Sequence, residues 1–391
     1  SQNRKIRGEG DMYKIMTAGP VQVRENVLAA RSIPCTNPDQ DVEFYEFYKE
    51  TCDLFSEALH TENRAIIMGG EGILGLEAAC ASLTEPGDRV LVIDNGIFGK
   101  GFADFVKIYG GEPVLYTTDY KNPVDPAGLE AYLEKDSDFR YATLVHCDTP
   151  SGVINDIPAL TNILDKFGIL SVVDSVAGMF GQPLDCAKSK IDILCGGSQK
   201  ALSAPPGLTM VWVSQRAFDF MEHRKTPIAS FYANIMTFKD YYENKWFPYT
   251  MPISDITGLR QALDNFMADD SVYDRHAKIA AATRYALVKG GLSLYLESGY
   301  SNTVTVLEVP EGITDKEILE GMMQDYNIMI SGCFDVLAGK VIRIGHMGEN
   351  ANAEDVAATL AALQGTLEKH GIKVAGDLAK EFKNTYENGA A

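Results

Sequence analysis

Between residues 43 and 59 the apolar side chains recur at every third or fourth position. Phe44, Phe47, Tyr48, Leu54 and Phe55 share this spacing, with charged residues between them. Because an α-helix completes a turn every 3.6 residues, this spacing places the apolar side chains on one face. The pattern therefore predicts an amphipathic helix whose apolar face packs against a core.

From about residue 65 the pattern changes to short apolar runs separated by stretches with helical spacing. Six runs rich in Val, Ile and Leu predict strands at residues 89–94, 113–117, 142–147, 170–174, 191–196 and 208–214. Residues 127–133 and 157–167 have helical spacing between these runs. Continuous apolar strands that alternate with helices predict a mostly parallel sheet covered on both faces. In such sheets, ligands bind at the carboxyl ends of the strands.

The pattern changes again beyond about residue 270. It predicts a long helix at residues 274–289, apolar segments at 303–309 and 341–344, and an alanine-rich helix at 353–370. We expect an arm at residues 1–20, a large domain at 21–272 and a smaller α/β domain at 273–391. No Gly-, Ser- or Pro-rich linker separates the two domains, so we expect a broad interface between them.

Composition narrows the classes of partner and compartment. The content of 46% hydrophobic and 23% charged residues is that of a globular protein, and the net charge of −19 argues against a nucleic-acid or anionic-membrane surface. The seven cysteines and six histidines form no metal-binding spacing, so we expect free thiols and no metal. Residues 1–5 are polar, and no apolar run approaches the ~18 residues of a membrane helix. We therefore expect a cytoplasmic protein.

Three polar features follow predicted strands, where a parallel sheet binds its ligands. Asp174 ends the run at residues 170–174, and Lys200 follows the run at 191–196 and a Gly-Gly turn. The glycine-rich Gly69-Gly70-Glu71-Gly72 precedes a stretch with helical spacing. Each feature taken singly has a structural explanation, because aspartates cap helices, most lysines are solvated, and glycine-rich turns are common.

Together, the three features supply what a pyridoxal cofactor needs. Desolvation of Lys200 in the crevice at the strand ends lowers its pKa and makes the amine a nucleophile toward a carbonyl. A buried carboxylate at Asp174 keeps a pyridine nitrogen protonated. The free N–H groups at a helix start bind the anionic 5′ group. The sequence therefore predicts a Schiff base between Lys200 and pyridoxal.

Five segments carry a resemblance to a known family. They are Asn95-Gly96-Ile97-Phe98-Gly99, Asp148-Thr149-Pro150-Ser151-Gly152, Asp174-Ser175-Val176, Gly197-Ser198-Gln199-Lys200 and Arg343-Ile344-Gly345-His346-Met347-Gly348. Over nearly its whole length the chain resembles the class V, fold-type I aminotransferases, and within them the alanine–glyoxylate and pyridoxamine–pyruvate branch. This resemblance implies a large domain with a mostly parallel seven-stranded sheet between helices, and a smaller C-terminal α/β domain.

The resemblance also implies roles for individual residues. Lys200 would form the Schiff base and act as base and acid in the proton shift, while Asp174 would pair with the pyridine nitrogen. Arg343 would clamp the substrate carboxylate, and Gly19 would also contact the substrate. The implied cofactor contacts are Gly70, Glu71, Gly72, Phe98 on the ring, Thr149 near the ring hydroxyl, Gln199 at the phosphate, and Tyr249 and Thr250 at the phosphate of a neighbouring subunit. Sites shared in this way imply a homodimer or homotetramer.

Structural explanations remain open for four of these residues. Phe98 and Tyr249 fit ordinary aromatic packing, Thr149 fits a turn before Pro150, and Arg343 fits a half-exposed position on a strand.

Glu71 departs from the family pattern, since most relatives have Ser or Thr there. A carboxylate ~4 Å from a phosphate is repulsive by several kcal/mol at an effective dielectric of about 20. We expect Glu71 to occupy the helix N-terminus, or to accept a hydrogen bond from a neutral 5′-hydroxyl, as in pyridoxamine–pyruvate aminotransferases. Gln199 and Tyr249 match the phosphate-binding relatives better, and residues 331–335 lack the further arginine of the vitamin-using branch. The sequence therefore allows either pyridoxal phosphate or unphosphorylated pyridoxal as the bound molecule.

Two functions follow from these observations. In the first, an aminotransferase with pyridoxal 5′-phosphate passes an amino group between a small amino acid, such as alanine, and glyoxylate or pyruvate. In the second, unphosphorylated pyridoxamine or pyridoxal is itself the substrate, with pyruvate as the partner. A lyase or desulfurase on the same scaffold, with Cys333 as its loop cysteine, is a third hypothesis. A non-catalytic binding protein would leave Lys200 without a role.

Overall fold

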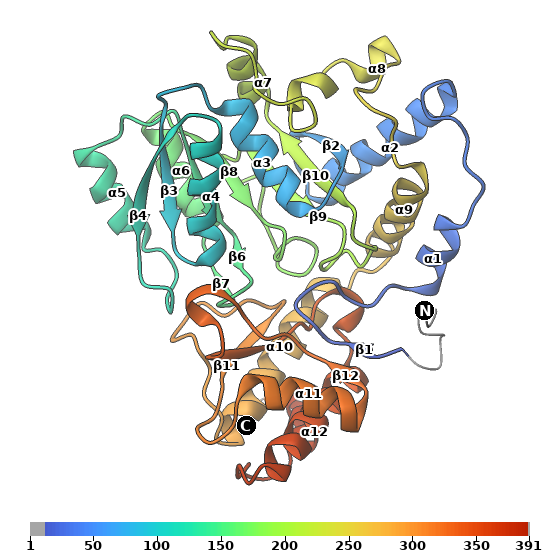
Figure 1. Cartoon of the computed structure of the whole chain (residues 1–391), viewed down its shortest axis with the longest axis vertical. Helices are drawn as coiled ribbons and strands as arrows, with labels where there is room; N and C mark the ends of the chain where they lie inside the picture. The colour runs from blue at the N-terminus through green and yellow to red at the C-terminus, as the bar shows by residue number, and fades with distance from the viewer. Residues whose placement is uncertain (1–11, 390–391) are drawn as a thin grey trace, which may run out of the picture.

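The computed structural model describes residues 12–389, so residues 1–11 of the predicted arm lie outside the described residues. The chain folds into an upper part built on one large sheet and a lower part of helices around two short sheets (Figure 1). The carboxyl ends of the parallel strands face the lower part (Figure 1). The predicted ligand-binding edge of the sheet therefore lies where the two parts meet.

The large sheet has seven strands; β10 pairs antiparallel with β2 and β9, and the remaining pairs are parallel. In spatial order they are β2 (Arg64–Gly69), β10 (Leu208–Val213), β9 (Ile193–Gly197), β8 (Leu170–Asp174), β5 (Tyr141–Val145), β3 (Arg89–Asp94) and β4 (Glu112–Thr117). The mostly parallel seven-stranded sheet is confirmed, and six of the strands lie within two residues of the predicted runs. The hydrophobic pattern missed β2, because its short apolar run merges into the glycine-rich turn.

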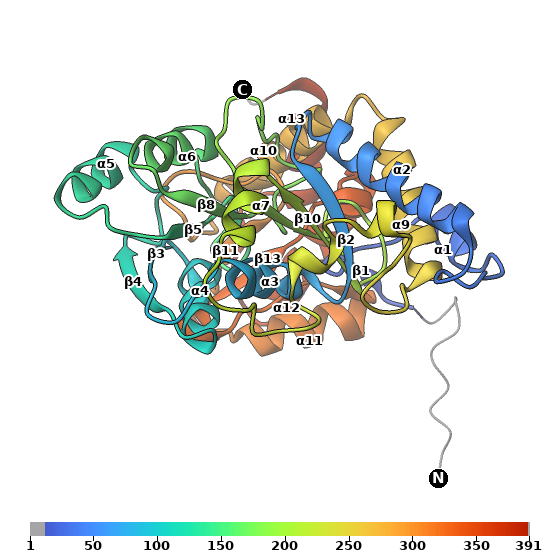
Figure 2. The same ribbon diagram turned by 90° about the horizontal axis from the view of Figure 1, so that it is seen from above.

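Helices cover both faces of this sheet. The pair α3 (Gly72–Leu83) and α4 (Ile97–Ile108) packs on one face, and α2 (Val42–Ala58) and α6 (Ile157–Lys166) pack on the other (Figures 1 and 2). The predicted amphipathic helix is α2, and Phe55 on its apolar face meets Trp212 of β10 with ring centroids 5.9 Å apart. The remaining helices of the upper part are α1 (Glu25–Arg31), α5 (Pro126–Lys135), α7 (Gln215–Glu222), α8 (Tyr241–Asn244) and α9 (Ile253–Met267).

The lower part has its own hydrophobic core, which includes Ile279, Leu307, Ile342 and Leu360. Its elements are α10 (Val272–Lys289), β11 (Thr305–Glu308), α11 (Asp315–Tyr326), β12 (Ile328–Met329), β13 (Val341–Ile344), α12 (Ala353–Lys369) and α13 (Leu378–Asn388). The strand β1 (Lys14–Ile15) pairs with β12. Residues 14–15 therefore lie in the lower part, although the residues that follow them form the upper part. The domain boundary expected at residue 272 stays a prediction.

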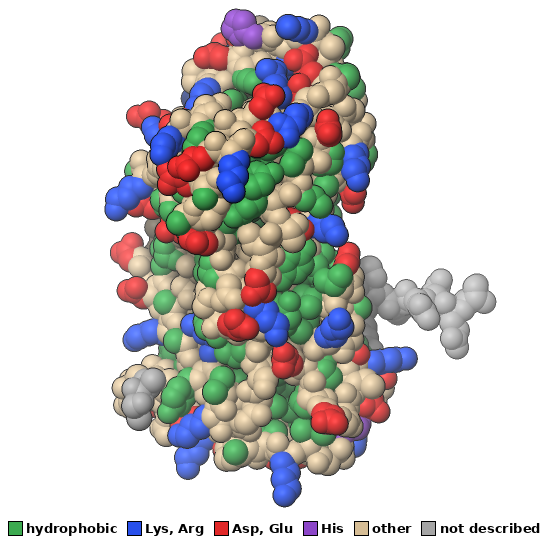
Figure 3. Space-filling model, turned by 90° about the vertical axis from the view of Figure 1, so that its left-hand side faces the viewer, with side chains coloured by type: hydrophobic (Ala, Val, Ile, Leu, Met, Phe, Trp, Pro, Cys, Tyr) green, Lys and Arg blue, Asp and Glu red, His purple; other side chains and the backbone are tan. Residues whose placement is uncertain are grey.

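The surface is acidic without a segregated basic region on the face drawn in Figure 3, where Lys and Arg side chains lie among Asp and Glu. Among residues 12–389, no helix is long and apolar enough to cross a membrane. The seven cysteines are free thiols, and four of them are buried, namely Cys52, Cys80, Cys147 and Cys195.

Candidate active site

Lys200 lies in the turn that follows β9, against the N-terminal segment of the chain. Its Nζ donates a hydrogen bond to the carbonyl oxygen of Ala18, at 2.5 Å. Gly19 has a left-handed φ of 98°, and a side chain there would collide with the Lys200 side chain. Burial, together with the positive charge of Arg343, lowers the pKa of Lys200 to about 8. About a tenth of this amine is therefore uncharged at pH 7, far more than for a solvated lysine.

Asp174 ends β8, the strand beside β9, and its side chain lies close enough to Lys200 for their charges to interact. The carboxylate accepts a hydrogen bond from the backbone N–H of Val176, at 2.9 Å. Burial raises the pKa of Asp174 to about 6, although this hydrogen bond and the charge of Lys200 favour the ionised form. A cation placed against this carboxylate would lower its pKa again.

Glu71 is the N-cap of α3 and faces the same region. Its Oε2 accepts from the backbone N–H of Ile73 at 2.8 Å, and its Oε1 accepts from Nε2 of Gln199 at 2.5 Å. The structure thus adopts the first of the two arrangements expected for Glu71. Gly70 and Gly72 flank it, and both are tightly packed, Gly70 against Leu74 and Gly72 against Val176.

The strand-end segment at Asp148 and Thr149 reaches the start of α4. Asp148, in the short strand β6 (Cys147–Asp148), is 1% exposed and accepts a hydrogen bond from the N–H of Gly99 at 3.1 Å. Its other oxygen is buried without a partner among the described residues, and burial raises the pKa of Asp148 to about 7. The sequence placed Asp148 in a motif without giving it a role, because only the fold brings it to the backbone beside Phe98.

Arg343 reaches the site from β13 of the lower part. It is 8% exposed, so the half-exposed position considered from the sequence is wrong. Its Nε donates to the carbonyl of Gly332 at 2.8 Å, and its Nη1 donates to the carbonyl of Thr149 at 3.3 Å. The guanidinium also lies 5.8 Å from the ring centroid of Phe334. Arg343 therefore joins the two parts of the chain beside Lys200.

Tyr249 and Thr250 make contacts within their own chain. The hydroxyl of Tyr249 accepts from the N–H of Gly69 at 3.0 Å, and its ring stacks on Tyr232 with centroids 4.5 Å apart. Thr250 donates from its hydroxyl to Asp39 at 3.1 Å. These contacts place Tyr249 beside the loop that leads to Glu71, while the expected contact with a neighbouring subunit stays a prediction.

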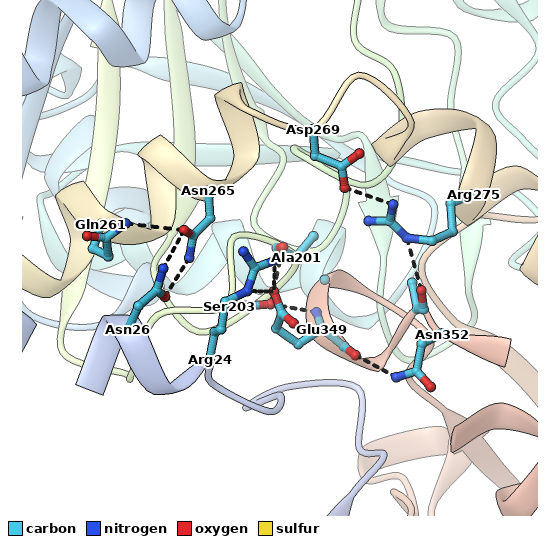
Figure 4. A network of polar contacts seen from close by, with 12 residues as sticks. Arg24, Asn26, Ala201, Ser203, Gln261, Asn265, Asp269, Arg275, Glu349 and Asn352 are labelled. Atoms are coloured by element: carbon cyan, nitrogen blue, oxygen red, sulfur yellow. Dashed lines mark hydrogen bonds and ion pairs between the residues drawn. The ribbon is translucent and has the colours of Figure 1, made fainter. Parts of the chain in front are cut away.

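A polar network holds the turn after Lys200 against the lower part (Figure 4). The hydroxyl of Ser203 accepts from the N–H of Glu349 at 2.9 Å, and the Glu349 carboxylate pairs with Arg24 at 2.8 Å. Ser203 has a left-handed φ of 63°, which the neighbouring hydrogen bonds hold in place. Sequence reasoning missed this network, since its members come from distant parts of the chain.

Comparisons with known proteins agree with this geometry. The family model described as aminotransferase class-V matches residues 35–358. The pyridoxamine–pyruvate transaminase of Mesorhizobium japonicum is 35% identical over 372 residues, covering 92% of this chain and 93% of that protein. The alanine–glyoxylate aminotransferase of Callithrix jacchus is 29% identical over 367 residues, covering 90% and 87%.

Solved structures match over almost the whole chain. Pyridoxamine–pyruvate aminotransferase from Mesorhizobium loti superposes with a TM-score of 0.92 at 32% identity, covering 98% of this chain and 100% of that one. Ureidoglycine–glyoxylate aminotransferase from Bacillus subtilis gives a TM-score of 0.94 at 29% identity, with the same coverage of 98% and 100%. Class V aminotransferases depend on pyridoxal phosphate. The chain belongs to the class V aminotransferases, in the branch of the alanine–glyoxylate and pyridoxamine–pyruvate transaminases.

Proposed function

We propose that this aminotransferase moves an amino group between a small amino donor and a small 2-oxo acid, pyruvate or glyoxylate, with Lys200 as its reactive amine. The observation that carries the proposal is the Lys200 amine itself, with a pKa of about 8 and close to both Asp174 and Arg343. A solvated surface lysine would stay protonated and could not attack a carbonyl.

The residues around Lys200 fit the ring and aldehyde of pyridoxal. Asp174, buried and with its pKa raised, would pair with a protonated ring nitrogen. Phe98 lies in the first turn of α4, at the same edge of the sheet, and would pack on the ring, with Thr149 beside the ring hydroxyl. Pyridoxal supplies an electron-withdrawing ring that stabilises negative charge at the amino carbon of the donor.

The chain's own residues would then bind the substrate and move its proton. Arg343 would hold the carboxylate shared by amino acids and 2-oxo acids. Lys200 Nζ would take the proton from the donor Cα and return it to the carbon that receives the amino group. The carbonyl of Ala18, which accepts from Nζ at 2.5 Å, would hold the amine between these transfers.

A specific observation favours the second function, in which the vitamin is unphosphorylated. The 5′ end of the ring would face the start of α3, where a phosphate needs free N–H groups. Here the Glu71 carboxylate accepts hydrogen bonds from the N–H of Ile73 and from the side-chain amide of Gln199, so these donors are not free for a phosphate. We therefore propose pyridoxamine and pyridoxal as substrates, with pyruvate as the partner 2-oxo acid. The 35% identity to a pyridoxamine–pyruvate transaminase supports this choice.

Absorption spectra of the purified protein test both levels of the proposal. We expect a band near the visible edge to form with pyridoxal and to bleach when L-alanine is added, with release of pyruvate. The Lys200→Ala variant should form no such band. Failure of the wild-type protein to form the band with either vitamer would contradict the role of Lys200. A protein purified with tightly bound pyridoxal phosphate would contradict only the choice of vitamer.

Replacing Glu71 by Ser tests the electrostatic argument separately. Serine also caps helices, so α3 should keep its start. Loss of the negative charge should raise the affinity for pyridoxal phosphate relative to pyridoxal by about tenfold or more. Titration of both vitamers into both proteins measures this ratio, and an unchanged ratio would count against a role for Glu71 in vitamer choice.

The desulfurase hypothesis finds less support. Cys333 lies beside Arg343, with its Sγ 3.9 Å from the carbonyl of Pro150. Burial raises the pKa of its thiol despite the positive charge of Arg343, whereas a nucleophilic cysteine needs a lowered pKa. We therefore propose transamination rather than sulfur transfer.

A further inference from the structure

We propose that Phe334 determines substrate specificity, by selecting short 2-oxo acids that carry a single carboxylate. This inference rests on the proposed function, since it concerns the substrate bound at Arg343. Phe334 is not among the residues to which the sequence assigns a role, although its segment, residues 331–335, contains Cys333 and lacks an arginine.

The position of the ring is the first argument. Phe334 meets the ring of Phe98 edge-on, with centroids 5.7 Å apart, and its own centroid lies 5.8 Å from the Arg343 guanidinium. Phe98 is the residue proposed to pack on the vitamin ring, and Arg343 is the residue proposed to hold the carboxylate. A side chain that touches both must border the space in which the remainder of the substrate lies.

The turn that carries Phe334 is the second argument, because it fixes the ring in this position. The carbonyl of Gly332 accepts from Arg343 Nε at 2.8 Å. On the other side of Phe334, Asp335 has a left-handed φ of 56°, and its carboxylate accepts from the N–H of Val336 at 2.7 Å. The ring is nevertheless 43% exposed, so it is available to a ligand as well as to its neighbours.

The charges around the space give the third argument. Among the described residues, Arg343 is the cation that acts on Lys200, and the other strong charges beside it, Glu71 and Asp174, are acidic. A second substrate carboxylate would meet the Phe334 ring or these acids without a partner of its own, which is unfavourable. A methyl group or hydrogen in the same place would be favourable against the ring.

The first test enlarges the space. In Phe334→Ala, the ratio of kcat/KM for 4-methyl-2-oxopentanoate to kcat/KM for pyruvate should rise about tenfold, the effect expected of space for several methylene groups. Val336→Ala, which shortens an exposed side chain in the same turn, serves as the matched control and should leave the ratio unchanged. Equal changes for both acids in Phe334→Ala would mean a structural role only and would overturn the inference.

The second test changes charge rather than size. In Phe334→Arg, the ratio of kcat/KM for 2-oxoglutarate to kcat/KM for pyruvate should rise at least about tenfold, because the new guanidinium pairs with the second carboxylate. Because the ring is partly exposed, both variants should fold, and thermal melting checks this. A wild-type protein inactive with every 2-oxo acid would overturn the proposed function. An active wild-type protein whose ratios do not move in either variant would overturn only the role of Phe334.

Discussion

Charged side chains are buried at both ends of the central sheet, but those at the amino end have more hydrogen-bond partners than those at the carboxyl end. At the amino end of β9, the buried Asp192 accepts hydrogen bonds from the N–H of Ser171, the hydroxyl of Ser214 and two nitrogens of Arg216, at 2.7–2.9 Å. At the carboxyl end, Asp174 accepts from the N–H of Val176, and one oxygen of Asp148 has no partner among the described residues.

The difference separates a structural network from a reactive one. The pKa values of Lys200, Asp174 and Asp148 are moved to about 8, 6 and 7, toward neutrality, because their burial is not matched by partners. Buried ionisable groups whose pKa values are shifted in this way are characteristic of functional sites, where a ligand supplies the missing partners. A cavity of about 600 Å³ lies at the Asp192 end, lined in part by Asn63, Lys190 and Arg216. A cavity of this size therefore does not by itself mark the reactive end of the sheet.

Removal of the Lys200 amine should have the largest effect on activity. Lys200→Ala should lower kcat for transfer from L-alanine by at least about 10³-fold, because it removes the group proposed as nucleophile and as base. Its melting temperature near pH 7 should not fall, because the lowered pKa of Lys200 means that burying its protonated amine costs stability. Pyruvate release and thermal melting measure the two effects. Lys190→Ala at the opposite end should keep full activity, and an equal loss there would contradict the assignment.

Neutralising the buried acid should have the next largest effect. Asp174→Asn should lower kcat by about 100-fold, because an amide cannot hold the ring nitrogen protonated. Steady-state rates with saturating pyridoxal check this prediction. Activity within twofold of the wild-type value would remove Asp174 from the proposed chemistry.

The opposite end of the sheet should respond in stability rather than in rate. Asp192→Asn weakens the pairing with Arg216, which is half-exposed, so we expect a loss of about 2 kcal/mol in the free energy of unfolding. The kcat of the folded variant should stay within about twofold of wild type. Urea unfolding and activity assays at a temperature where both proteins are folded give the comparison. A loss of activity without a loss of stability would mean that Asp192 serves the site.

The rate of pyridoxal binding should depend on pH through the Lys200 amine. Only the uncharged Lys200 amine attacks a carbonyl, so the rate of band formation should rise about tenfold between pH 7 and pH 9 and level off above the pKa of about 8. Since this pKa lies below that of an unfolded lysine, the stability of the vitamin-free protein should rise with pH from about 8 to 10.5. Lys200→Ala should lose this rise in stability, and a rate that is flat with pH would contradict the lowered pKa.

The central strands β5, β8 and β10 were predictable because each is a continuous apolar run, buried on both faces. The ends of the parallel strands carry Asp174 and Lys200, so their approach follows from the parallel order alone. The pairing of β1 with β12 was not predictable, because two residues at each place carry no periodic signal. For the same reason the contact of Ala18 with Lys200, and that of Asp148 with α4, appeared only in the folded chain.

The resemblance located Arg343 but not its surroundings. The sequence contains no sign that the backbone carbonyl of Thr149, at the edge of the large sheet, would accept a hydrogen bond from a guanidinium of the lower part. It also gave no sign that Phe334 would lie against both Phe98 and Arg343, because such contacts depend on how the two parts pack. Glu71 was the exception, since its capping role follows from its place before a helix.

Lys200, rather than any of the solvated lysines, should be the residue that bonds to pyridoxal. Incubation with pyridoxal, reduction with sodium borohydride and mapping of the peptides by mass spectrometry test this directly. We predict one stoichiometric pyridoxyl adduct, on the peptide that contains Gly197-Ser198-Gln199-Lys200. Adducts spread over surface lysines, with Lys200 unmodified, would contradict it.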